Sequence, residues 1–303
     1  MEKEFWRSIA ANRFQVPSGF TVEQLTPELI SKLGERDPEL RDYYIYTTLE
    51  KWIGEGLYTP AQLRNMIAQL TKNLRVGLGE QGTDSVLLRS FSALTLSEIV
   101  KYENRHPFLR AEEIVPIMEQ SIFYLLHEQD LRAYVEGQGW IHAMAHAGDL
   151  LGVLARNRYV EERELERLLA ALAEKVALPT TQMFVMLEEE RLALVVVAAL
   201  TRKVVRFSFW HWWLRQLEEV GEPLRWEDTV HFARQKDICA YHNTKLFLHA
   251  LYFQLQLGGY RLPDVPDLVE RITRTLYRLD PGFYSVEVMK ILDPDIDTDQ
   301  LHT

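Results

Sequence analysis

The chain has little of what marks a disulfide-rich, membrane-spanning or nucleic-acid-binding protein. Cys239 is its single cysteine, so no disulfide can form within the chain. Acidic residues outnumber basic ones by 44 to 34, and the formal charge of −10 argues against nucleic acid as a partner. The longest apolar run, LALVVVAAL at 192–200, is far shorter than the roughly 20 residues of a membrane-spanning helix.

The N-terminal segment MEKEFWRSIAANRF also lacks the continuous apolar stretch of a signal peptide. With neither an export signal nor paired cysteines, we expect a cytoplasmic protein that does not associate with membranes. Hydrophobic residues nevertheless make up 47% of the 303 residues, which excludes a disordered chain. The composition therefore predicts a globular protein with a sizeable core.

Common nucleotide-binding and hydrolase motifs are missing as well. The sequence contains no GxxxxGK[ST] phosphate loop, and its GxGxxG string, GLGEQG at 77–82, lies between two predicted helices and not between a strand and a helix. It also has no GxSxG nucleophile elbow. Any catalysis would have to depend on another set of residues, and the sequence leaves open whether the protein is an enzyme.

The sequence does contain residues that mark the starts of helices. Thr26-Pro27, Asp37-Pro38 and Thr59-Pro60 each place a capping residue before a proline, which suits the first position of a helix. Strand signals are nearly absent, and no Asn-Gly or Asp-Gly turn joins alternating apolar runs. We therefore predict an all-α fold. The predicted helices are 27–33, 38–53, 60–76, 83–104, 111–127, 139–156, 160–176, 182–206, 208–219, 226–236, 240–257, 264–277 and 285–292.

The spacing of the predicted helices suggests how they are arranged. A pair of them occupies about 45 residues, within the range of about 40–47 typical of armadillo and HEAT repeats. This favours antiparallel helix pairs stacked as an α-solenoid, although no residue signature repeats at that period. An α/α toroid or an irregular helical bundle stays open. We expect one domain over 1–303, with 1–25 and 280–303 as peripheral terminal segments.

The segment EQDLRAYVEGQGWIHAMAHAGDLL at 128–151 is the most unusual part of the chain. Gly137 and Gly139 predict a flexible entry to a helix that begins near Trp140. On such a helix His142, His146 and Asp149 fall on one stripe, at positions i, i+4 and i+7.

Three functions are compatible with this stripe. Two imidazoles one turn apart and a carboxylate could hold a divalent metal such as zinc, as on the HExxH helix, although Ala143 replaces its catalytic glutamate. One histidine could instead act as a general base oriented by Asp149. In the third interpretation, both histidines form hydrogen bonds to neighbouring helices or contact a ligand without metal.

Charged residues lie just upstream, where Glu128, Asp130 and Arg132 precede the glycines. They could form one wall of a polar pocket, in which Arg132 binds a carboxylate or phosphate in bidentate fashion. The alternative is an ion-pair network that ties a loop to adjacent helices.

A second polar stripe is predicted within 83–104, where Ser85, Arg89 and Ser92 share one face. Small hydroxyls around an arginine suit an anion or another polar ligand. Serines within a helix also commonly bond back to its own backbone, which needs no ligand.

The segment GWIHAMAHAGDLL at 139–151 resembles the signature of an uncharacterised family of bacterial all-helical proteins, a domain of unknown function found mainly in Bacillus-like Gram-positive bacteria. Similar pieces are Asp84-Ser85-Val86, Arg89-Ser90-Phe91-Ser92, Glu128, Asp130-Leu131-Arg132, Phe247-Leu248 and Leu251-Tyr252-Phe253-Gln254-Leu255. The likeness covers roughly 20–260, with Ala133 as a departure where the family has glycine. It implies an all-helical cytoplasmic domain and carries no established activity.

Two functions therefore compete. In the first, a groove binds a peptide, a protein or a small polar ligand without chemistry. Its predicted contacts are Ser85, Arg89, Ser92, Glu128, Asp130, Arg132, Trp140, His142, His146 and Asp149. In the second, the same residues close around a pocket and form a metal-dependent or acid–base enzyme of hydrolase type.

Overall fold

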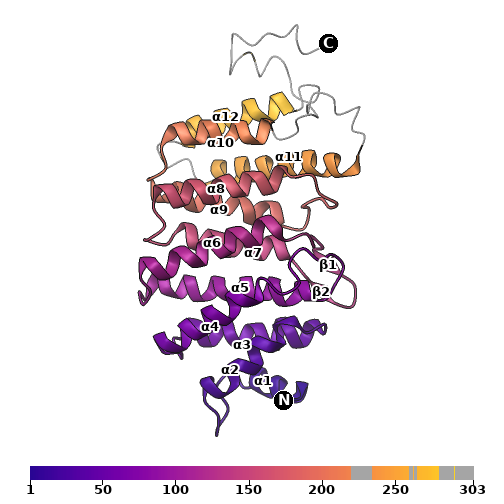
Figure 1. The fold of residues 1–303 in the computed structure, drawn as a ribbon, viewed down its shortest axis with the longest axis vertical. Helices are drawn as coiled ribbons and strands as arrows, with labels where there is room; N and C mark the ends of the chain where they lie inside the picture. Colours follow the sequence, from indigo (N-terminus) through magenta and orange to yellow (C-terminus); the bar gives the residue numbers. More distant parts are fainter. Residues whose placement is uncertain (220–233, 259–261, 263–264, 280–289, 291–303) are drawn as a thin grey trace. The chain divides into compact units, whose positions relative to one another are not determined.

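A computed structural model describes residues 1–219, 234–258, 262, 265–279 and 290 (Figure 1). Within these ranges the fold is all-helical apart from one two-stranded hairpin, which confirms the predicted class. The helices are α1 (Lys3–Ala11), α2 (Val22–Ser31), α3 (Thr47–Gly54), α4 (Pro60–Asn73), α5 (Ser85–Arg105), α6 (Ala111–His127), α7 (Ala143–Ala155), α8 (Glu162–Ala177), α9 (Glu188–Arg202), α10 (Phe207–Glu219), α11 (Gln235–Gly258) and α12 (Val265–Leu279). None of these helices is long and apolar enough to cross a bilayer. The predicted helices at 226–236 and 285–292, and the segment 280–303, lie almost entirely outside the described residues.

Two of the three Thr/Asp-Pro signals mark helix starts. Thr59 and Gln62 form a reciprocal capping box at the start of α4, and the Asp37 carboxylate accepts the backbone N–H groups of Glu39 and Leu40. The prediction from Thr26-Pro27 is wrong, because α2 begins at Val22 and is capped earlier in the chain.

The earlier cap of α2 is another reciprocal box. The Thr21 hydroxyl accepts the Gln24 backbone N–H, and the Gln24 side chain accepts the Thr21 N–H. Thr26 therefore lies inside the helix, where its hydroxyl donates to the Val22 carbonyl and lies 2.9 Å from the Tyr58 hydroxyl.

The contacts divide the chain into two compact units, Met1–Glu164 and Leu165–Thr303. In the first unit α5 is central, because it packs against α3, α4 and α7. Helix α1 belongs to this unit, since it buries Trp6 and Ile9 against a π-helical turn, η2 (Glu39–Tyr46). In the second unit α9 packs against α11, and α12 packs against α10 and α11.

Candidate functional site

The segment around His142 folds differently from the predicted helix. Strands β1 (Tyr134–Val135) and β2 (Gly139–Trp140) form an antiparallel hairpin, and α7 begins only at Ala143. The backbone N–H groups of Ile141 and His142 both point at the Ala133 carbonyl, at 2.7 and 3.3 Å. His142 accordingly adopts a left-handed conformation with φ +49° and precedes the helix, so the predicted stripe with His146 and Asp149 on one helix is wrong.

Both imidazoles are packed against aromatic rings. His142 stacks on Trp140 with ring centroids 4.2 Å apart, and His146 meets Phe91 edge-on at 5.1 Å. His146 also places Nδ1 2.8 Å from the Ser90 hydroxyl.

The two histidine rings meet edge-on at 5.9 Å, whereas Asp149 is only half-buried, further along α7. Across the residues that the structure describes, no group of three or more His, Cys, Asp or Glu side chains is placed to hold a metal ion. The geometry at His142 and His146 is that of an aromatic seam with one serine contact.

Arg89 and Glu128 form a bidentate ion pair with both side chains fully buried. Arg89 Nε and Nη2 donate to the two Glu128 oxygens at 2.5 and 2.9 Å. Arg89 Nη1 donates to the Ser85 hydroxyl and to the carbonyls of Val76 and Gly77. All three guanidinium nitrogens are therefore bonded to the protein itself.

Asp130 and Arg132 form a second ion pair, which contacts the loop between α4 and α5. Arg132 donates to both Asp130 oxygens at 2.8 and 2.7 Å, and this bonding raises the pKa of the arginine. The Gly82 N–H donates to Asp130, and Arg132 donates to the Thr83 carbonyl. Together with Arg89 and Glu128, these contacts tie the loop between α4 and α5 to the segment after α6. They match the ion-pair alternative.

Sequence reasoning missed Arg41, a fully buried residue of η2. Its Nη2 donates to the carbonyls of Gln138 and Trp140 at 2.8 and 3.1 Å, which anchors the hairpin. The ion pair of Arg41 with Asp42 opposes the larger effect of burial, which raises the pKa of Asp42 to about 6. No local signal marks the role of Arg41 in the hairpin, because its partners there, the carbonyls of Gln138 and Trp140, lie about a hundred residues away in the sequence.

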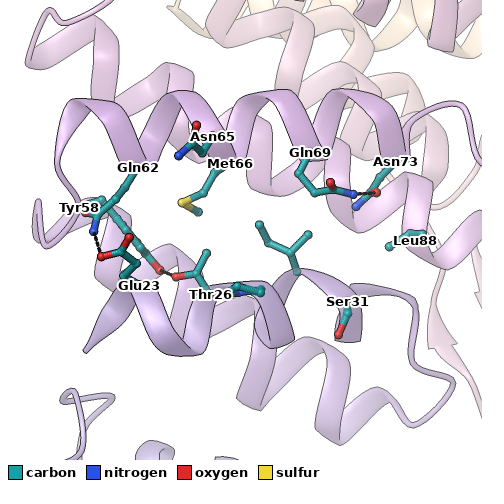
Figure 2. A pocket seen from close by; sticks show the side chains of 12 residues that line it. Glu23, Thr26, Ser31, Tyr58, Gln62, Asn65, Met66, Gln69, Asn73 and Leu88 are labelled. Carbon is teal, nitrogen blue, oxygen red and sulfur yellow. Dashed lines mark hydrogen bonds between the residues drawn. The ribbon is translucent and has the colours of Figure 1, made fainter. Parts of the chain in front are cut away.

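The first unit also contains an open groove of about 690 Å³ between α2 and α4 (Figure 2). Its lining combines hydroxyls and amides with an apolar floor. The lining residues are Glu23, Thr26, Pro27, Ile30, Ser31, Tyr58, Gln62, Asn65, Met66, Gln69, Asn73 and Leu88. Glu23 is the one charged residue among them, so the groove does not attract anions.

Helix α4 supplies all the amide side chains of the lining. Its residues Gln62, Asn65, Met66, Gln69 and Asn73 recur at helical spacing and line the groove, and Figure 2 shows Met66 pointing toward α2. Gln69 donates to Asn73 at 3.0 Å, and Asn73 donates to the buried Ser92 hydroxyl behind it at 3.1 Å. Asn65 is exposed and forms no side-chain hydrogen bond with the described residues.

The predicted contact residues do not line this groove. Of α5 only Leu88 reaches it, whereas Arg89 and Ser92 are buried behind it. The sequence signal that was available is the amide run of α4, where Gln and Asn recur at steps of three and four between helix-favouring apolar residues.

The fold and the groove define an all-helical protein with a mainly neutral, amide-lined cleft in its first unit. The chain belongs to the family described as "Protein of unknown function (DUF2785)", whose model matches residues 74–253. No curated protein and no solved structure matches the chain. The matched range includes the loop network and His142, whereas every groove residue except Leu88 precedes it.

Proposed function

We propose that the protein binds an extended peptide segment in the α2–α4 groove and performs no chemistry there. The observation that carries the proposal is a pair of exposed amides on α4, Asn65 and Gln69, which line the groove four residues apart. A primary amide donates and accepts at once, so it can pair with both polar groups of a peptide unit.

The spacing of these amides suits an extended chain. Four helical residues advance about 6 Å along the axis. In an extended peptide, groups on the same side recur every two residues, or about 6.8 Å. Successive amides of α4 can therefore meet successive peptide groups on one edge of the ligand.

The remaining lining sets the preferred ligand. From Gln62 to Asn73 the helix advances about 16 Å, which accommodates roughly five extended residues. Met66 and Ile30 offer an apolar floor for a side chain of the ligand. Because Glu23 is the only charged lining residue, neutral and basic peptides are favoured over acidic ones.

We also infer how the helices are arranged and where the protein is located in the cell. The antiparallel helices would stack as armadillo- or HEAT-like pairs, an arrangement that presents an elongated binding surface. A cytoplasmic location agrees with the buried free thiol of Cys239. The acid–base and metal-dependent alternatives have less support, since His142 and His146 are buried against aromatic rings.

The proposal is tested by a binding assay that compares the parent protein with a variant in which a bulky side chain fills the groove. Fluorescently labelled, end-blocked hexapeptides that are neutral, Lys-containing or Glu-containing would be titrated with the full-length protein by polarisation. Asn65→Trp places a bulky ring in the groove, and Ala68→Trp is the control. Ala68 is exposed on the same helix but does not line the groove.

We expect saturable binding of neutral or Lys-containing peptides, weakened at least tenfold by Asn65→Trp and unchanged by Ala68→Trp. Equal binding by the two variants, or a preference for the Glu-containing set, would contradict the proposal. Circular dichroism would establish that both variants are folded.

A further inference from the structure

The loop between α8 and α9 exposes a cluster of apolar side chains. Met183, Val185, Met186 and Leu187 are 46, 56, 43 and 50% exposed. We call these four residues the 183–187 patch. Single exposed apolar residues are common on protein surfaces, but four within five positions form a contiguous patch of the kind found at interaction sites.

The loop is anchored firmly from beneath. Asn243 of α11 is fully buried, and its side chain accepts the Phe184 N–H at 2.7 Å and donates to the Gln182 carbonyl at 3.1 Å. The Phe184 ring is itself buried. The patch is therefore exposed by a defined loop conformation.

The backbone of Leu187 is strained. It adopts φ +72°, in the left-handed region where a leucine is strained and glycine or asparagine is favoured. A half-exposed leucine gains little from burial in the folded chain, so neither backbone conformation nor solvation favours this residue type here. Strain of this kind is concentrated at functional positions.

A second element borders the same end of α9. Gln254 of α11 donates to the Glu190 carbonyl at 2.9 Å. On either side of it, Phe253 and Leu257 are 63 and 82% exposed and lie one helical turn apart. The helix that contacts the start of α9 therefore has exposed apolar side chains of its own.

Acidic residues follow the patch directly. Helix α9 opens with Glu188, Glu189 and Glu190, of which Glu188 is buried and accepts the Met186 N–H, while Glu190 is exposed. We propose that the 183–187 patch docks a basic amphipathic helix of a partner protein, with apolar side chains against the patch and Lys or Arg facing the exposed Glu190 and the half-buried Glu189. Flexible methionines adapt to different helix surfaces, and helices of this kind bind through such apolar anchors.

The same charges disfavour two other occupants. An anionic lipid surface attracts basic segments, so the glutamates beside the patch would oppose membrane binding. A second copy of the chain would bring the same acidic residues together. The proposal is independent of the groove, because the patch belongs to the other unit.

The test uses a helical model peptide of about 14 residues that carries Leu on one face and Lys on the other, and a counterpart with Glu in place of Lys. Binding to the full-length protein would be measured by calorimetry at low and high salt. The variants are Leu187→Asn and Met186→Gln. Leu57→Asn is the matched control, because Leu57 is an exposed leucine in a loop of the first unit.

We expect the Lys peptide to bind and the Glu peptide not to bind. Both patch variants should weaken binding at least tenfold, and Leu57→Asn should leave it unchanged. Because asparagine tolerates the left-handed conformation, Leu187→Asn should unfold at the same or a higher urea concentration than the parent protein, which separates lost binding from lost folding.

Three kinds of result would overturn the proposal, and the third can take two forms. One is equal affinity for the Lys and Glu peptides, and another is full affinity in both patch variants. The third is a different occupant: phosphatidylcholine vesicles that bind the parent but not Leu187→Asn would assign the patch to a membrane. Likewise, a dimer seen by sedimentation that Leu187→Asn abolishes would assign it to self-association.

Discussion

The loop network around Arg89 and the amide row of α4 lie in the same helical unit but direct their polar groups differently. Arg89, Glu128 and Asp130 are buried and bonded to one another and to loop backbone. Along α4, Asn65 and Gln69 are exposed toward a groove. Charged residues clustered in a sequence are thus no guide to a ligand site, because the first question is whether the fold already uses all their donors and acceptors.

The largest effect should come from breaking the buried ion pair. Arg89→Met leaves the Glu128 carboxylate buried without its guanidinium, which we expect to lower the free energy of unfolding by about 3–5 kcal/mol. Urea denaturation measures the change. In the double variant Arg89→Met/Glu128→Leu the loss should be smaller than in the single variant, and an equal or larger loss would show that the pair is not the stabilising unit.

A smaller loss of stability is expected for a substitution in the hairpin formed by β1 and β2. Gly139 has φ +73°, and a Cβ there would lie 2.7 Å from Pro38 Cβ, so Gly139→Ala combines backbone strain with a clash. We expect a loss of about 2–3 kcal/mol in the free energy of unfolding.

Gly137→Ala is the control for this clash. Gly137 also has a positive φ, of +79°, but a Cβ there would meet nothing within 4 Å. Strain alone should cost about 1 kcal/mol. Equal losses for the two alanines, measured in the same urea series, would mean that the contact between the hairpin and Pro38 contributes nothing to stability.

The stability of the protein should depend on pH through the Asp42 carboxyl, which lies beside Arg41. Burial raises the pKa of Asp42 to about 6, so the folded state binds this proton more tightly than the unfolded state. Its contribution to stability is present below the ordinary aspartate pKa and is lost as the pH rises to about 6. Because the side chain is 31% exposed, we expect a change of only about 1 kcal/mol.

Asp42→Asn should remove this slope when unfolding free energies are compared at pH 4 and pH 7. Glu39→Gln provides a control of opposite sign, because the bond from Lys3 lowers the pKa of Glu39, and its contribution is lost as the pH falls. A parallel pH profile for Asp42→Asn and the parent protein would contradict the assignment.

The smallest effect on stability is expected in the groove. Asn65→Ala removes an exposed amide that forms no side-chain hydrogen bond with the described residues, so the free energy of unfolding should change by less than about 0.5 kcal/mol. The same variant should weaken binding of a neutral hexapeptide about five- to tenfold, the equivalent of one or two net hydrogen bonds. A large loss of stability would instead place Asn65 among the structural residues.

Sequence patterns predicted the helical class and several helix starts because these depend on neighbouring residues. Thr59-Pro60 marks the start of α4 through contacts within four positions. The helix start predicted from Thr26-Pro27 is wrong because a capping box at Thr21 starts α2 earlier in the chain. The hairpin at 134–140 has no Asn-Gly turn, and its geometry depends on Arg41, which lies far away in the sequence.

The sites were harder to predict because they depend on tertiary neighbours. In the sequence, Arg89 and the group of Glu128, Asp130 and Arg132 are separate features, and only their partners in the loop between α4 and α5 show that they are internal. The groove requires α2 to lie beside α4, which no local pattern of α4 reveals.

Methionine-methyl NMR of the full-length protein offers the most direct test of the groove as the binding site. Met66 lies in the groove, whereas Met144 lies on α7 between His142 and His146. On titration with a neutral hexapeptide, the account predicts that the Met66 methyl signal shifts and the Met144 signal does not. A shift of Met144 with Met66 unchanged would place the ligand at the histidines and contradict the account.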